Sequence, residues 1–273
     1  MTSEKKRVLI TVKTYPHPSK KMKETVCTAG ITDDGQWIRL YPIPYRYLAE
    51  PTSFHIFDWI DVMATKRPPQ KDRRPESYAV DCSSIRKVRY LDSKKDALER
   101  YEYIRKKEKD SLETVLDEHE KMGTSLSAIR PKKMIGLEIE ADAPDWTEEQ
   151  KTQLNQISFL DGETNPKPLR KVPYKIYCRF ECNNPSCKGH RMLLTSWEYN
   201  WTFLKLLDEY NQNEKAALEE LNKRWMNNFS NTRLGYLIFG TVHAMERFHT
   251  FIVIGHCSFK KIDVDRGKQM CLF

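Results

Sequence analysis

Residues 177–192 read YCRFECNNPSCKGHRM and place Cys178, Cys182, Cys187 and His190 in the pattern C-x3-C-x4-C-x2-H. Thiolates and imidazole are the ligands that a tetrahedral zinc ion prefers. The residues between the second cysteine and the histidine are rich in asparagine, proline and glycine, which favours a turn, and strand-like residues flank them. The stretch therefore predicts a metal knuckle between two strands, with zinc in a structural role.

The four candidate ligands are not equivalent. Cys187 and His190 are separated by two residues, one of them glycine, so the backbone can fold around one ion, and Cys182 faces them from the other arm. Cys178 lies four residues earlier on an expected strand and needs a bend to reach the same ion. His249 is the leading alternative for the fourth ligand. It belongs to a second histidine and cysteine stretch that also holds His243, His256 and Cys257.

Two other interpretations of the knuckle stay open at this stage. Cysteine is often buried as a small apolar residue, so the thiols could serve packing alone. Three protein ligands plus water would instead activate a hydroxide, and Glu198 is an available base for that chemistry.

Composition points to a folded protein with an anionic partner. The 273 residues carry 46 lysines and arginines against 38 acidic residues, a formal charge of +8, and 11% of the residues are aromatic. Such a charge favours RNA, DNA or an acidic membrane. No run approaches the roughly 20 apolar residues of a membrane span, and the first residues lack the features of a signal peptide. We therefore expect a cytoplasmic protein without a membrane partner, whose seven cysteines are metal ligands or buried thiols.

The order of strand-like and helix-like segments predicts an α+β fold. Four strand-like runs occupy the first 65 residues, and Asp33-Asp34-Gly35 has the composition of a hairpin turn, which together predict a small antiparallel sheet or barrel. Residues 66–76, KRPPQKDRRPE, are expected to form an exposed basic arm. Helical composition over 92–122 is followed by strand character over 124–140 and by a short helix capped near Thr147.

The remaining segments predict a carboxy-terminal α+β region. Strands are expected on both sides of the knuckle, at 174–180 and 191–198, then a helical stretch to about residue 225 and strands at 234–242 and 251–257. We expect three regions. They are a β-rich nucleic-acid-binding domain over 1–90, a helical and mixed connection over 91–165, and a zinc-knuckle domain with a C-terminal tail over 166–273.

The amino-terminal region interleaves aromatic and basic residues in a way that could stack bases and hold phosphates. Strand aromatics and surface bases also occur without such a role. The residues predicted to contact nucleic acid are Lys13, Tyr15, Trp37, Arg39, Tyr41, Arg46, Lys71, Arg73 and Arg74.

The chain ends in Gln269, Met270, Cys271, Leu272 and Phe273. This pentapeptide resembles the short motif, commonly Gln-Leu-Ser/Asp-Leu-Phe, by which bacterial DNA polymerases and repair factors bind the replication sliding clamp. Gln269, Leu272 and Phe273 match, and Met270 replaces leucine conservatively. The resemblance implies a bacterial protein that acts on DNA and docks through Gln269, Met270, Leu272 and Phe273. Packing of a C-terminal strand on the protein's own core is the competing interpretation.

Common catalytic motifs do not occur in the sequence. Walker, GxGxxG, GxSxG, HExxH and EF-hand patterns are lacking, and the H-x-E element of zinc deaminases is missing. Carboxylates such as Glu138, Glu140 and Asp142, or Asp161 and Glu163, could hold Mg²⁺ for a nuclease. The sequence therefore predicts a DNA-binding accessory protein in replication, repair or mobile-element defence. A metal-dependent nuclease or other nucleic-acid hydrolase is the alternative, and a protein-binding module is a third possibility.

Overall fold

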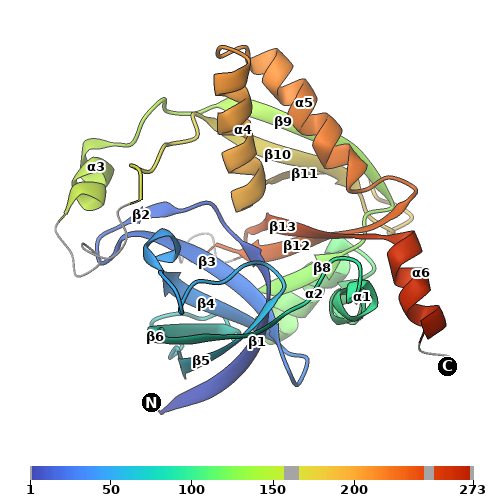
Figure 1. Ribbon diagram of the computed structural model, residues 1–273. Coiled ribbons are helices and arrows are strands. Elements are labelled where there is room, and N and C mark those ends of the chain that lie inside the picture. Colours follow the sequence, from blue (N-terminus) through green and yellow to red (C-terminus); the bar gives the residue numbers. More distant parts are fainter. Residues whose placement is uncertain (1, 157–165, 243–248, 271–273) are drawn as a thin grey trace. The chain divides into compact units, whose positions relative to one another are not determined.

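The computed structural model describes residues 2–156, 166–242 and 249–270 (Figure 1). The chain divides into two compact units. The first comprises Met1–Tyr90 and Ala141–Tyr174, and the second comprises Leu91–Glu140 and Lys175–Phe273. The three consecutive regions expected from the sequence thus differ from the observed units. Residues 91–165 do not form a region of their own, because the chain leaves the first unit after residue 90 and returns to it at residue 141.

The first unit is built on a closed barrel. Its strands are β1 (Ser3–Lys13), β2 (His17–Ser19), β3 (Lys23–Thr32), β4 (Trp37–Ile43), β5 (Asp58–Lys66) and β6 (Ser77–Tyr90). The sheet order is β1-β5-β6-β4-β3-β2, and an additional pairing between β1 and β3 closes a ring of five strands. Only β4 and β6 pair in parallel among these neighbours. The expected small sheet or barrel is therefore confirmed.

The strand order identifies the type of barrel. Counted in chain order without the short β2, the five strands follow each other around the ring as 1-2-3-5-4. This is the Greek-key arrangement of the OB-fold. Alternate residues of each strand point inward and form the core, as strand geometry requires. The buried core consists of Val8, Ile10, Ile38, Leu40, Ile43, Phe54, Ile60, Val62 and Ile85.

Local signals in the first unit are confirmed in two places. Gly35 has a positive φ of 80° in the turn that joins the antiparallel strands β3 and β4. Thr147 caps α3 (Glu148–Asn155) through a capping box with Gln150. A 3₁₀ helix, η1 (Tyr45–Tyr47), follows β4.

The expectation of a fully exposed basic arm over residues 66–76 is wrong. Asp72, Arg74 and Glu76 are buried, whereas Lys71 and Arg73 are exposed. Arg74 donates from Nε and Nη2 to the two carboxylate oxygens of Asp72 at 2.8 and 2.7 Å. This two-point ion pair satisfies both charges, which makes their burial possible.

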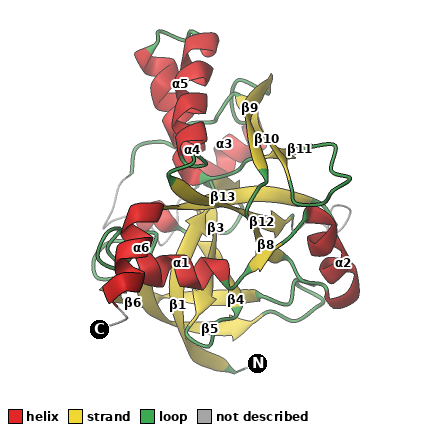
Figure 2. Ribbon diagram, turned by 90° about the vertical axis from the view of Figure 1, so that its right-hand side faces the viewer, coloured by secondary structure: helices red, strands yellow, loops and turns green. Residues whose placement is uncertain are grey.

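The second unit contains two sheets. One has the order β13-β12-β8-β7 and the other has the order β11-β10-β9. The strands are β7 (Glu108–Lys109), β8 (Leu126–Ile129), β9 (Lys133–Ala141), β10 (Tyr174–Glu181), β11 (His190–Leu193), β12 (Arg233–Thr241) and β13 (Phe251–Lys260). The helices are α1 (Ala97–Arg105), α2 (Leu112–Met122), α4 (Trp197–Glu209), α5 (Glu214–Asn227) and α6 (Lys261–Met270), and α4 and α5 lie side by side (Figures 1 and 2).

The α+β fold class is thereby confirmed, although two boundaries differ from expectation. The strand predicted over 191–198 ends at Leu193, and α4 begins at Trp197. Tyr199, Phe203 and Leu206 are buried at helical spacing, so this segment buries one helical face. Residues Lys261–Met270 form the helix α6, whereas the competing interpretation of the C-terminal residues was a strand.

Gly30 allows β1 and β3 to approach closely enough to close the barrel. A Cβ atom at this position would lie 2.5 Å from the carbonyl oxygen of Leu9 and 2.5 Å from Cγ1 of Val8. We expect Gly30→Ala to lower the free energy of unfolding by about 1–3 kcal/mol, because the backbone carbonyl cannot rotate away. Chemical denaturation measures this. Gly35→Asn is the control and should cost less than about 1 kcal/mol, since asparagine tolerates positive φ. Equal effects of the two changes would contradict the prediction.

Candidate metal centre

Three side chains converge at the turn between β10 and β11. The Nε2 atom of His190 lies 3.3 Å from the Sγ atoms of both Cys187 and Cys182, and all three ligand atoms lie within 4.8 Å of one another. A tetrahedral ion with bonds of about 2.0–2.3 Å sets its donors roughly 3.5 Å apart. Cys182, Cys187 and His190 can therefore hold one metal ion.

The sequence of the turn explains this convergence. Phe180 pairs with His190 across β10 and β11, so the two arms of the knuckle begin side by side. The backbone N–H of Cys187 donates to the carbonyl oxygen of Asn184 at 3.0 Å and makes the chain reverse. Gly189, with a φ of 93°, then directs its own N–H to the sulfur of Cys187 at 3.4 Å. The glycine noted in the sequence thus supplies a backbone conformation that L side chains rarely adopt.

Backbone N–H groups also surround the sulfur atoms. The N–H of Cys182 donates to Cys187 Sγ at 3.4 Å, in addition to the contact from Gly189. The sulfur of Cys182 accepts from the backbone N–H groups of Leu112 and Asn184. Burial raises the pKa of the Cys182 thiol, and the N–H groups of Leu112 and Asn184 act against that shift by favouring the thiolate.

Two predicted ligands lie elsewhere. Cys178 is fully buried on β10, opposite Met192, and burial raises the pKa of its thiol far above the usual value. It stands two strand residues before Phe180 and does not join the three ligand atoms, because β10 stays paired with β11 residue by residue from Tyr177 to Phe180. His249 is exposed, and its Nδ1 atom lies 3.0 Å from Nε2 of His119 on α2. Cys178 and His249, both predicted as ligands, therefore lie outside the cluster that the structure brings together.

The other members of the 243–257 stretch do not supply a ligand either. His256 lies among the rings of Tyr199, Trp225 and Phe229, and burial lowers its pKa to about 4, so the imidazole is neutral at pH 7. Cys257 is buried on β13, which raises its thiol pKa. His243 lies outside the described residues.

Most of the side chains predicted to contact nucleic acid are engaged within the first unit. Lys13 is buried and lies over the ring of Tyr45, and Arg39 is buried with Nη1 3.1 Å from Cys27 Sγ. Arg46 forms an ion pair with the buried Glu24 and also donates to the carbonyl oxygen of Lys167. Sequence reasoning missed these contacts because each depends on a residue far along the chain or on another strand.

The remaining members of that set vary in exposure. Tyr15 donates its hydroxyl to the carbonyl oxygen of Arg170 at 2.9 Å. Trp37 and Tyr41 are half-buried, and Arg74 is buried as described above. Lys71 and Arg73 are exposed and keep access to solvent.

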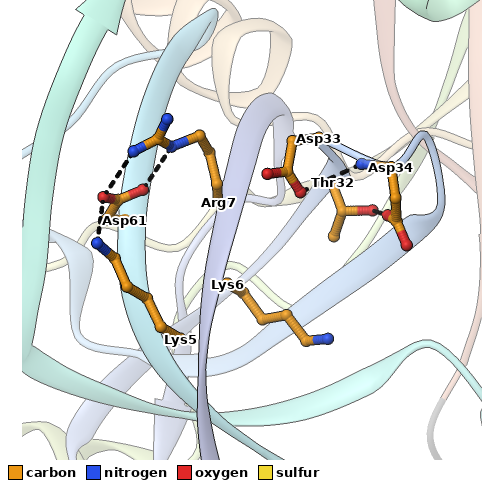
Figure 3. A pocket seen from close by; sticks show the side chains of 7 residues that line it. All are labelled: Lys5, Lys6, Arg7, Thr32, Asp33, Asp34 and Asp61. Carbon is orange, nitrogen blue, oxygen red and sulfur yellow. Dashed lines mark hydrogen bonds and ion pairs between the residues drawn. The ribbon is translucent and has the colours of Figure 1, made fainter.

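A charged cleft on the barrel was not found from the sequence. It has a volume of about 320 Å³ and is lined by Lys5, Lys6, Arg7, Thr32, Asp33, Asp34 and Asp61 (Figure 3). Asp61 accepts from Arg7 at 2.7 Å and from Lys5 at 2.8 Å, and these contacts lower its pKa to about 2. The sequence signal for this cleft is the run of Lys5, Lys6 and Arg7 at the start of β1. This run does not indicate that Asp61 lies opposite Arg7, because Asp61 belongs to another strand.

The acids considered for Mg²⁺ form ion pairs. Glu138 pairs with Arg179 at 2.8 Å and with Arg191 at 2.9 Å, and Arg191 also reaches Glu140 at 2.6 Å. Asp142 pairs with Lys171 at 2.8 Å. These carboxylates are neutralised by basic side chains. Asp161 and Glu163 lie outside the described residues.

The C-terminal motif is described only in part. Gln269 and Met270 are exposed at the end of α6, and the side chain of Met270 is 74% exposed. Cys271, Leu272 and Phe273 lie outside the described residues. Within the described ranges, no helix combines the length and apolar character needed to cross a membrane.

Comparison with known protein families shows which families the chain matches. It belongs to the family described as Domain of unknown function (DUF8757), which matches residues 107–271, more than half of the sequence. A second family, Domain of unknown function (DUF8758), matches residues 4–106, which include all of the barrel except the first residue of β1. No curated protein matches the chain.

Substitutions can test which of the cysteine and histidine side chains at the knuckle bind zinc. We expect Cys187→Ser and His190→Ala to abolish binding of one zinc equivalent, whereas Cys178→Ala keeps it, because only the first two side chains reach the cluster. Elemental analysis of the purified full-length variants measures the zinc content. Loss of zinc from Cys178→Ala, in a variant whose circular dichroism spectrum is unchanged, would contradict the assignment.

Proposed function

We propose that this protein is a cytoplasmic DNA-binding accessory factor in bacterial replication, repair or mobile-element defence, with a structural zinc ion in its second unit. The observation that carries the proposal is a basic row on the outer face of the barrel, formed by Lys5, Arg7, Arg86 and Arg89. All four side chains are exposed.

Strand register places this basic row on one face. Asp61 on β5 pairs with Arg7 on β1 and with Arg86 on β6, and residues directly opposite in a sheet share a face. Lys5 lies two residues before Arg7 and so points the same way. Trp59, two residues before Asp61, pairs with Arg89, and the register shift between Trp59 and Ile60 brings Arg89 to the face of Arg86.

Charge and barrel type support an anionic polymer as the ligand. Asp61 pairs with Lys5 and Arg7, and Asp33 and Asp34 line the same cleft as these two bases. Arg86 and Arg89 do not line that cleft, so the acids neutralise only part of the charge of the row. Five-stranded OB barrels commonly bind oligonucleotides, mainly on the face of their second and third strands, which are β3 and β4 here. The barrel type therefore supports the class of ligand, and the charge of the row supports its place on β1, β5 and β6.

The cluster of Cys182, Cys187 and His190 supports zinc over other metals. Two thiolates and one imidazole are ligands of the zinc class, and the cluster joins the ends of two paired strands. The proposed role of the ion is to fix this turn, which the sequence alone leaves with few apolar residues to bury.

Removal of three charges from the basic row tests the proposed DNA site. We expect Lys5→Gln/Arg86→Gln/Arg89→Gln to weaken binding of labelled oligonucleotides. The slope of log K against log salt concentration should become shallower by about 2–3, since each lost phosphate contact removes roughly 0.7–0.9. Fluorescence anisotropy with single-stranded DNA, double-stranded DNA and RNA of equal length, at several salt concentrations, measures both quantities.

A charge-matched variant controls for the overall field of the protein. Lys20→Gln/Lys21→Gln/Lys167→Gln removes the same charge from exposed positions of the first unit that lie outside the row. It should keep most of the wild-type slope. Equal losses in both triple variants would refute the assigned surface, and an absence of binding by the wild-type protein would refute the function.

The resemblance of residues 269–273 to clamp-binding peptides supports docking on the replication sliding clamp. The exposure of Gln269 and Met270 on α6 is compatible with an accessible peptide. Leucine and phenylalanine side chains at a chain end can enter an apolar pocket as anchors.

Deletion of residues 269–273 is expected to abolish binding to a bacterial sliding clamp, as measured by surface plasmon resonance with the full-length protein as reference. Met270→Leu, which restores the common leucine of the motif, should bind at least as tightly as wild type. A wild-type protein that shows no clamp binding would refute this part of the proposal without affecting the DNA site.

A further inference from the structure

The three donors of the knuckle leave one position of a tetrahedral ion to be filled. The residues considered from the sequence do not fill it, because Cys178 is packed in the core and His249 contacts His119. A carboxylate from a distant part of the chain contacts one of the donors. The Oε2 atom of Glu113, in the first turn of α2, is 3.5 Å from the sulfur of Cys182. The carboxylate lies outside the group formed by Cys182, Cys187 and His190, so the exposed Glu113 side chain has to turn toward the other two donors to share their ion.

We infer that Glu113 is the fourth ligand of the metal ion at Cys182, Cys187 and His190. This inference rests on the proposed zinc site. It adds a fourth ligand that lies 69 positions before Cys182 in the sequence. An oxygen from Glu is an ordinary zinc ligand, alongside cysteine sulfur and histidine nitrogen.

The start of α2 is fastened to the knuckle by contacts that do not involve Glu113. The backbone N–H of Asn183 donates to the carbonyl oxygen of Asp110 at 3.3 Å. The N–H of Leu112 donates to the sulfur of Cys182. Ser111 caps the helix by accepting from the N–H of Thr114 at 3.2 Å. Glu113 is therefore presented to the cluster by a backbone that is already held in place.

Charge gives the physical reason for a shared ion. A divalent cation held by Cys182, Cys187 and His190 attracts anionic oxygen donors. The Glu113 carboxylate is such a donor, and it already contacts the sulfur of Cys182.

The consequence for function is a closed site. An ion with four protein ligands has no position for an activated water, so it ties α2 to the β10–β11 turn and does not catalyse hydrolysis. This arrangement favours the structural role in the proposed function over the hydrolase considered from the sequence.

Cobalt substitution of the full-length protein tests the inference. We expect Glu113→Gln to weaken Co²⁺ binding by at least about tenfold, since even outer-shell changes cost 10–100-fold. Glu113→Cys should raise the thiolate-to-cobalt charge-transfer absorption per bound ion by roughly half, because a third thiolate joins the two present. Absorption spectra recorded during Co²⁺ titration measure both effects.

Glu120→Gln and Glu120→Cys are the matched controls, because Glu120 is exposed on the same helix. Both should bind Co²⁺ like wild type and keep the intensity of two thiolates. An unchanged charge-transfer intensity in Glu113→Cys, with one ion bound, would overturn the assignment of Glu113 alone. A wild-type protein that binds no Co²⁺ or Zn²⁺ would overturn the proposed metal site itself.

Discussion

The second unit depends on one electrostatic constraint at the β10–β11 turn. Cys182, Cys187 and His190 place two sulfur atoms and a ring nitrogen almost in contact, and the carboxylate of Glu113 touches one of the sulfurs. As thiolates, these groups would repel each other, and the proposed cation would offset that repulsion.

The first unit depends on a different constraint, the closure of its sheet. β1 pairs with both β3 and β5, and Gly30 permits the close approach that this double pairing needs. Closure removes free strand edges and separates an apolar interior from an outer face. It also fixes the register that sets Arg7, Asp61 and Arg86 in line. The proposed DNA surface is therefore a product of barrel geometry.

Much of the fold could be predicted from residue patterns, because the signals are local. Strand-like runs, the turn at Gly35 and the cap at Thr147 act within a few residues, and each was found where expected. The exposure of charged residues could not be predicted in this way. Arg74 lies in a segment that reads as an exposed basic arm, yet its ion pair with Asp72 allows it to be buried.

The sequence by itself determined that Cys182, Cys187 and His190 come together as a cluster that could hold a metal ion, because their spacing and one glycine bring them together within nine residues. Only the tertiary structure decided that Cys178 and His249 do not join them and that Glu113 does approach. Spacing along the chain limits which neighbours can meet around an ion. It carries no information on a helix that starts some 70 residues earlier, because long-range contacts follow from the packing of whole elements.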